Sequence, residues 1–165
     1  MAIGLTRIKH VKLPVTDLRS SASWYCKLFD LELAAEYAEQ GEVRGVTLRD
    51  REDGIEIALR QREHCAGTPQ LAGFDVFALL APTKEQVLTV AERCDRLGIT
   101  HTDVWDFPGF GAGFDIPDPD GIHVRIAWHD PHGGFSSGFL GIDSDAAGRP
   151  HTYHSARLDL PVRLG

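Results

Sequence analysis

The sequence predicts an α+β protein built from two copies of a β-α-β-β-β module. Short runs alternate apolar with polar residues, which is the period of a strand with one buried face. Two other segments carry apolar residues at helical spacing. The whole pattern occurs twice, because the expected helix starts, Asp17 and Thr83, lie 66 residues apart. The two DG hairpin turns, at Asp53 and Asp120, lie 67 residues apart.

The first module is expected to occupy residues 1–61. Its opening strand follows from the alternation in HVKLPV. Asp17 offers an N-cap for the helix, and Asp30 suits the left-handed position that ends it. The segment DREDG forms a turn between the last two strands. The predicted elements are a strand over 10–15, a helix over 18–29, and strands over 31–37, 43–48 and 55–59.

The second module is expected over residues 73–130, after a linker over 62–72. Thr83 and Gln86 form a capping box that starts its helix, and Gly98 stops the helix. A hairpin turn is predicted at PDPDG. The predicted elements are a strand over 74–81, a helix between Thr83 and Gly98, and strands over 100–107, 111–116 and 122–128.

Residues 131–165 differ from both modules. This segment is rich in Gly, Ser, Asp and His and has little periodicity, although RLDLPVRL near its end could form a short strand. Two interpretations stay open: an irregular C-terminal extension draped over the domain, or a lid or dimer arm.

Composition excludes several classes of protein. Among 165 residues, 17 Lys and Arg face 24 Asp and Glu, and the formal charge of −7 argues against nucleic-acid and anionic-membrane binding. The sequence contains no run of about 18 apolar residues, so no membrane span is predicted. The segment MAIGLTRIKH does not resemble a signal peptide, and three dispersed cysteines do not predict a disulfide framework. We therefore expect a cytoplasmic protein.

Three segments resemble the vicinal oxygen chelate superfamily, which includes glyoxalase I, bleomycin-resistance proteins, fosfomycin-resistance enzymes and extradiol dioxygenases. They are HVKLPVTDLRSSASWYCKLFDLEL, FALLAPTKEQVLTVAERCDRLGI and FGAGFDIPDPDGIHVRIAW. With the repeat, the resemblance covers residues 5–130. It implies the glyoxalase/bleomycin-resistance/dioxygenase fold, in which eight strands form a curved sheet around a cleft. It also implies a small-molecule ligand, often a divalent metal, and often a homodimer.

The metal ligands that the resemblance implies lie on the first, fourth, fifth and eighth strands. His10 matches the first position, and Glu56 lies on the fourth strand, although counting from the turn glycine selects Ala58 instead. The second module departs from the pattern, because Val76 and Arg125 stand at its two positions and neither binds a metal. Asp75 is adjacent to Val76 and is expected to point to the opposite face.

An alternative metal set remains, because His123 shares a face with Arg125. His10, Glu56 and His123 would give two imidazoles and one carboxylate, which suit iron, manganese, nickel or zinc. The set closes only if the sheets adjust, because His123 is displaced along its strand by two residues, about 6.6 Å.

A cleft without metal needs other binding groups. Arg125 suits a carboxylate, phenolate or phosphate, or else forms an ion pair with Glu56. Lys12 is a further cation on the same face as His10. His10 and His123 could act as acid and base near neutral pH. An aromatic wall could come from four residues that could equally pack in the core, namely Trp105, Phe107, Phe110 and Phe114.

Three hypotheses follow. The first is a metal-free protein that sequesters an aromatic or anionic small molecule. The second is a metal-free enzyme that uses His10 or His123 with Arg125. The third is a metal-dependent lyase, isomerase or dioxygenase that uses His10, Glu56 and His123. The missing ligands of the second module favour the first two, and the sequence does not separate these.

Overall fold

The structure is a computed structural model that describes residues 8–52, 54–133, 141–147, 149–155 and 157. The first module forms a four-stranded sheet in the order β1-β4-β3-β2, in which β1 runs parallel to β4 and the other pairs are antiparallel. A helix, α1, packs on one face of this sheet. The elements are β1 (Val11–Val15), α1 (Leu18–Phe29), β2 (Glu32–Glu39), β3 (Glu42–Arg49) and β4 (Glu56–Gln61).

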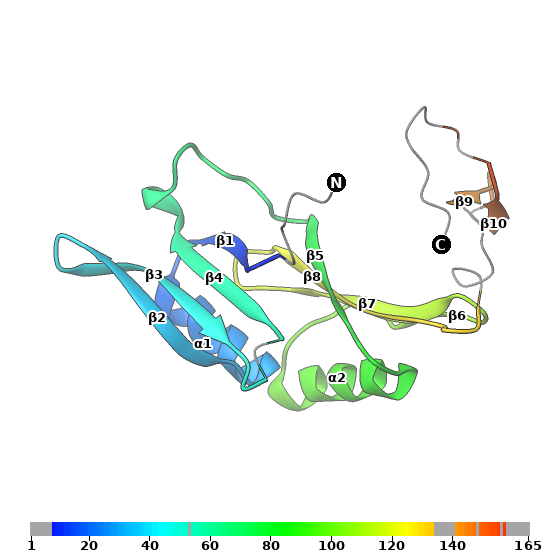
Figure 1. Cartoon of the computed structure of the whole chain (residues 1–165), viewed down its shortest axis with the longest axis horizontal. Helices are drawn as coiled ribbons and strands as arrows, with labels where there is room; N and C mark the ends of the chain where they lie inside the picture. Colours follow the sequence, from blue (N-terminus) through cyan, green and yellow to red (C-terminus); the bar gives the residue numbers. More distant parts are fainter. Residues whose placement is uncertain (1–7, 53, 134–140, 148, 156, 158–165) are drawn as a thin grey trace, which may run out of the picture.

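The second module repeats this plan. Its sheet has the order β5-β8-β7-β6, again with one parallel pair, β5 and β8. Its elements are β5 (Asp75–Leu80), α2 (Lys84–Leu97), β6 (Trp105–Phe107), β7 (Gly111–Pro117) and β8 (His123–His129), and a short 3-10 helix, η1 (Arg62–His64), lies before them in the segment expected as the linker. The predicted α+β class with paired β-α-β-β-β modules is therefore confirmed. Figure 1 shows the two modules side by side.

The predicted helix ends are present at both helices. Asp17 accepts a hydrogen bond from the Ser20 amide at 2.9 Å, and Asp30 adopts the left-handed conformation with φ 54°. Thr83 accepts from the Gln86 amide at 3.2 Å, and Gly98 ends α2 with φ 66°. Local side-chain chemistry therefore sets where each helix begins and ends.

Two segments differ from expectation. The strand predicted over 100–107 is reduced to the three residues of β6, and before it only Thr102 bonds across to β7, through Asp115. In the C-terminal segment, β9 (Gly141–Ser144) and β10 (Pro150–Tyr153) pair as an antiparallel hairpin where no regular structure was expected. Figure 1 shows this hairpin apart from both modules. Most of RLDLPVRL lies outside the described residues.

A single apolar core joins the modules. It contains buried residues from both helices and both sheets, including Leu13, Tyr25, Leu59, Phe114 and Ile126. The Tyr25 hydroxyl donates to Asp118 in the β7–β8 turn at 2.9 Å, so a polar contact also crosses between the modules. Burial raises the pKa of both groups, and it outweighs the hydrogen bonds that lower the pKa of Asp118. No helix among the described residues is long and apolar enough to cross a membrane.

Candidate functional site

Each sheet packs one face against its helix. We call the opposite face, on which no described helix packs, the open face. On the first sheet, Leu13 and Leu59 point into the core. Side chains alternate along a strand, so their neighbours Lys12, Ala58 and Thr47, which are aligned across three strands, lie on the open face. The candidate site is built on these two open faces.

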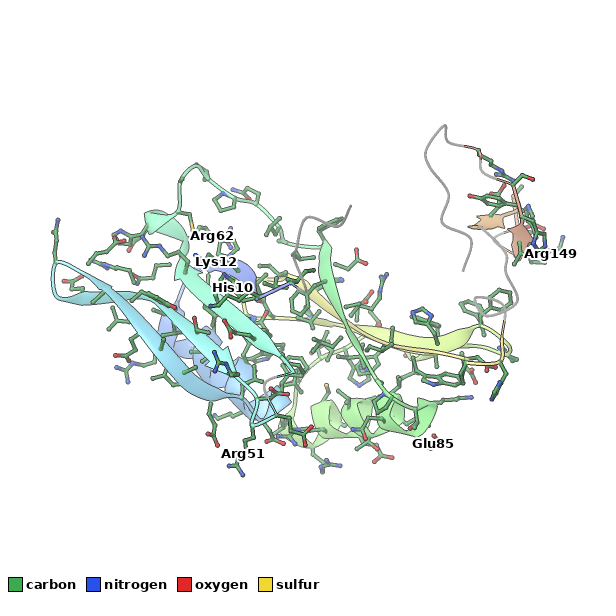
Figure 2. All side chains as sticks on the ribbon, in the orientation of Figure 1. His10, Lys12, Arg51, Arg62, Glu85 and Arg149 are labelled. Atoms are coloured by element: carbon green, nitrogen blue, oxygen red, sulfur yellow. The ribbon has the colours of Figure 1, made fainter. Side chains whose placement is uncertain are left out.

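A hollow of 360 Å³ lies on the open face of the first sheet. Figure 2 shows His10 and Lys12 close together beside β1 and β4, and both residues line this hollow. Gly45 keeps its floor flat, because a Cβ there would lie 2.9 Å from the Leu59 carbonyl oxygen. Polar groups come from the neighbouring strands, where the Thr47 hydroxyl lies 3.3 Å from the Tyr37 hydroxyl. The hollow therefore combines a basic edge with hydroxyl groups.

Glu56 lies beside this hollow and is held by cations. Arg49 donates two hydrogen bonds to its Oε2, at 2.8 and 3.1 Å, and Lys9 Nζ lies 3.2 Å from its Oε1. These hydrogen bonds, led by those of Arg49, lower the pKa of Glu56. His10 Nδ1 lies 3.6 Å from Glu56 Oε1 and is buried, with no hydrogen-bond partner among the described residues. The predicted pair of His10 and Glu56 is thus brought together.

On the second sheet, Arg125 is held between two aspartates. Asp115 accepts from its guanidinium at 2.8 and 3.1 Å, and Asp75 Oδ2 lies 2.7 Å from its Nη1. The hydrogen bonds that Arg125 donates to Asp115 are the main cause of the raised pKa of Arg125. The structure therefore pairs Arg125 with carboxylates of its own sheet rather than with Glu56. A bound anion at Arg125 would have to compete with two internal carboxylates.

The expectation that Asp75 points away from this face was wrong. The register between β5 and β8 shifts between Asp75 and Phe77, which leaves Val76 in a bulge. A bulge adds one residue to a strand and so changes which side chains share a face. Asp75 consequently pairs in register with His123 and reaches Arg125. No sequence signal marked this bulge.

The two modules place similar residue types on their paired strands. The first module brings His10 of the β1 end next to Glu56 of β4. The second aligns Asp75 of β5 with His123 of β8. Each sheet thus places one imidazole beside one carboxylate on its parallel pair of strands. The imidazole lies at the end of the first strand in the first module, and on the last strand in the second module.

The four aromatic residues separate into two environments. Trp105 and Phe107 stack on each other with ring centroids 5.7 Å apart, and the Trp105 ring lies over Gly113, where a Cβ would meet it at 2.6 Å. Phe107 is half exposed. Phe114 is fully buried in the core against His101, and Phe110 is partly buried in the β6–β7 turn.

The described residues do not fit a divalent metal. No group of three or more His, Cys, Asp or Glu side chains converges on a common point in the described part of the chain, so His123 does not join His10 and Glu56. The guanidinium of Arg49 and the ammonium of Lys9 already compensate Glu56. A dication at this point would add to that positive charge.

Sequence reasoning missed the partners of the two charged site residues. Arg49 lies directly opposite Glu56 in the β3–β4 hairpin, and Asp115 lies directly opposite Arg125 in the β7–β8 hairpin. Counting outward from the two DG turns could have found both pairs, because opposite residues of a hairpin share a face. Asp75 could not be found in this way, because its position depends on the bulge.

Comparison with known proteins agrees with this architecture. The family model described as Glyoxalase/Bleomycin resistance protein/Dioxygenase superfamily matches residues 7–126. A domain of that description from Frankia sp. EAN1pec has a TM-score of 0.63 at 20% identity, covering 78% of this chain and 98% of its own. No curated protein sequence is significantly similar.

Two further solved structures share the fold. TnmS3, an antibiotic binding protein from Streptomyces sp. CB03234, has a TM-score of 0.64 at 14% identity, covering 78% of this chain and 100% of its own. A variant of the fosfomycin resistance protein FosX from Listeria monocytogenes, complexed with Mn(II) and 1S,2S-dihydroxypropylphosphonic acid, has a TM-score of 0.60 at 18% identity. That match covers 79% of this chain and 95% of its own.

Proposed function

Because the chain belongs to the glyoxalase/bleomycin resistance protein/dioxygenase superfamily, we propose that its open faces bind a small organic molecule without a metal ion. The observation that carries this proposal is the 360 Å³ hollow beside His10 and Lys12, whose size suits a small ligand. Lys12 is exposed, and so it is the cation best placed to meet an anionic or phenolic group. On the second sheet, outside this hollow, the stacked Trp105 and Phe107 would favour contact with an aromatic ring.

The proposal that no metal is bound rests on the residues that stand at the two expected ligand positions of the second module. Val76 lies in the β5 bulge and has no ligand atom, and Arg125 is a cation held by two aspartates. The fosfomycin resistance protein above holds Mn(II), so the fold itself permits a metal. The alternative is a metal-dependent lyase, isomerase or dioxygenase using His10, Glu56 and His123.

Elemental analysis separates these two functions. We expect no stoichiometric iron, manganese, nickel or zinc in the purified chain. One equivalent of metal per chain that is lost in His10→Ala would overturn the metal-free proposal and favour the alternative.

Ligand charge can be tested with two phenols of similar size and opposite charge, 4-hydroxybenzoate and 4-hydroxybenzylamine, titrated by NMR. We expect the carboxylate to bind more tightly, and Lys12→Ala to weaken it about threefold to tenfold. Lys27→Ala, on the exposed side of α1, is the matched control and should leave the affinity unchanged. Equal binding of both probes, or no effect of Lys12→Ala, contradicts the assignment.

Acid/base catalysis is a second use of the same site. The buried Nδ1 of His10, 3.6 Å from Glu56 and without a hydrogen-bond partner among the described residues, favours it. A carboxylate beside one ring nitrogen can orient the imidazole so that the other nitrogen moves a proton. Turnover that survives chelators and is lost in His10→Ala would identify an enzyme, whereas reversible binding without turnover would identify a sequestering protein.

We also propose that the chain forms a homodimer in which the first open face of one copy meets the second open face of its partner. The first open face carries cations in excess, and the second carries carboxylates in excess. The residues concerned are Lys9, Lys12, Arg49 and Glu56 on the first face, and Asp75, Asp115 and Arg125 on the second. Such complementarity steers association and weakens with salt. Sedimentation should show a dimer that dissociates more readily at high salt, and a salt-independent monomer contradicts this.

A further inference from the structure

A trough lies on the other side of the first sheet, between α1 and the strands β2 and β3. Two hollows of 670 and 610 Å³ make it up, and both are lined by Cys26. We call them together the α1 trough. Because the first sheet itself separates it from the open face, the trough is independent of the function proposed above.

The trough exists because α1 covers only part of its sheet. The helix packs on β3 and β4, while β2 is the outermost strand. Val46 and Leu48 are buried and form the floor. Leu33 and Val43 form the uncovered wall, and they remain 55% and 38% exposed. The second sheet has no equal overhang, because its outermost strand β6 has only three residues.

Carboxylates outnumber cations among the residues that line the trough, most clearly where α1 ends. There the lining includes Glu32, Asp50 and Glu52, against the single cation Arg51, which pairs with Glu32 at 2.7 Å. The C-terminal end of a helix adds partial negative charge at the same place. The apolar stretch is lined by Asp17 and Glu36 and by one cation, Arg19. This excess of carboxylates favours a ligand that carries positive charge.

We propose that the α1 trough binds a small organic cation with an apolar body, such as an alkylamine. The apolar body would lie between α1 and the wall of Leu33 and Val43, and the ammonium group would lie toward Asp50 and Glu52. Each hollow has the volume of a small-molecule site. Apolar contact supplies affinity here, and the carboxylates select the sign of the charge.

Cys26 makes the proposal testable, because it lines both halves of the trough. In a Cys65→Ser chain, Cys26 is the accessible thiol, since Cys94 is buried. We expect octylammonium to slow maleimide labelling of Cys26, and octanoate to bind at least tenfold more weakly. Glu52→Gln should weaken octylammonium about twofold to fivefold.

Two further variants complete the test. Ser23→Trp, at an exposed position of α1 that lines the trough, fills the space and should weaken octylammonium more than tenfold while the chain stays folded. Glu85→Gln, on α2 outside the trough, is the matched control for lost charge and should have no effect.

Three results would overturn the proposal. The first is no protection of Cys26 by octylammonium, and the second is equal protection by octanoate. The third is protection that rises with protein concentration without any probe, which would mean that a second copy of the chain covers the trough.

Discussion

Individual charged residues of the open faces are neutralised within their own sheet. Arg49 and Lys9 hold Glu56, and Asp115 and Asp75 hold Arg125. These pairs fix the side chains in place before any ligand arrives, which reduces the ordering cost of binding. They also mean that a ligand must find its counter-charge elsewhere, and Lys12 is the exposed cation beside the hollow.

The pairing of Glu56 predicts a pH dependence of stability. Its pKa in the folded chain lies below the ordinary value of 4.5, because Arg49 and Lys9 favour the carboxylate. Its stabilising contribution is therefore present above pH 4.5 and is lost as the pH falls through the lowered pKa. Urea midpoints should place Glu56→Gln below the parent at pH 7, and the gap should close toward pH 3. A gap that is constant with pH contradicts the assignment.

Tyr25→Phe tests the buried contact between the modules. The change removes the hydroxyl that donates to Asp118 at 2.9 Å and leaves a buried carboxyl with one partner fewer. We expect a loss of about 1–3 kcal/mol in the free energy of unfolding, measured with urea. Tyr37→Phe is the matched control, because Tyr37 is half exposed, and its cost should stay below about 0.5 kcal/mol. Equal costs for both variants would show that the contact to Asp118 contributes nothing special.

For single residues, the sequence predicted the face of the sheet on which a side chain lies better than the residue with which it pairs. His10 and Glu56 were expected on one face and do lie together. The ion pair expected between Arg125 and Glu56 was wrong, because Arg125 pairs with Asp115 and Asp75. Asp115 could have been found by counting out from the DG turn, whereas the position of Asp75 depends on the β5 bulge. Phe114 shows the same limit, since an aromatic residue near a cleft can face either side of its strand, and here it lies in the core.

At the scale of elements, the structure follows the strongest local signals of the sequence. The Asp17 and Thr83 caps and the alternation in HVKLPV correspond to α1, α2 and β1 at nearly the expected residues. β6 is shorter than predicted, because a segment becomes a strand only where a neighbour pairs with it, and the ladder with β7 covers only Trp105–Phe107. The bulge at Val76 left no local signal, because bulges arise from pairing between strands.

Gly113→Ala tests how β6 packs on β7. A Cβ at this position would lie 2.6 Å from the Trp105 ring and 2.5 Å from the Ile126 carbonyl oxygen. The ring or the strand must then move, and we expect a loss of about 1–3 kcal/mol in unfolding free energy.

The matched control for this variant is Gly54→Ala. Its Cβ would meet only Asp50 Oδ2 at 3.4 Å, so we expect a change within about 0.5 kcal/mol. Trp105 fluorescence should shift in Gly113→Ala and not in the control. A Gly113→Ala chain of parental stability would show that the ring is free to move aside.

On the scale of the whole molecule, the two repeats behave as one body. They share one apolar core, and polar contacts between described residues also join them. Tyr25 of α1 bonds the turn that precedes β8. Asp120 of the same turn accepts from the Thr16 amide at 3.0 Å, and Arg93 of α2 holds Asp30 at the end of α1. The open faces are therefore fixed relative to each other by contacts on the helix side.

This shared core predicts a single cooperative unfolding transition, which the three tryptophans can test. Trp24 lies in α1, while Trp105 and Trp128 lie in β6 and β8, so single-tryptophan chains report separately on each module. We consider chains that retain only Trp24 or only Trp128, with the other tryptophans replaced by Phe. In each chain the urea midpoint of tryptophan fluorescence should equal the midpoint of far-ultraviolet circular dichroism. Two separated midpoints would show that each module folds alone and that the core between them is dispensable. In that case Tyr25→Phe should move only the Trp24 transition, whereas a cooperative chain moves as a whole.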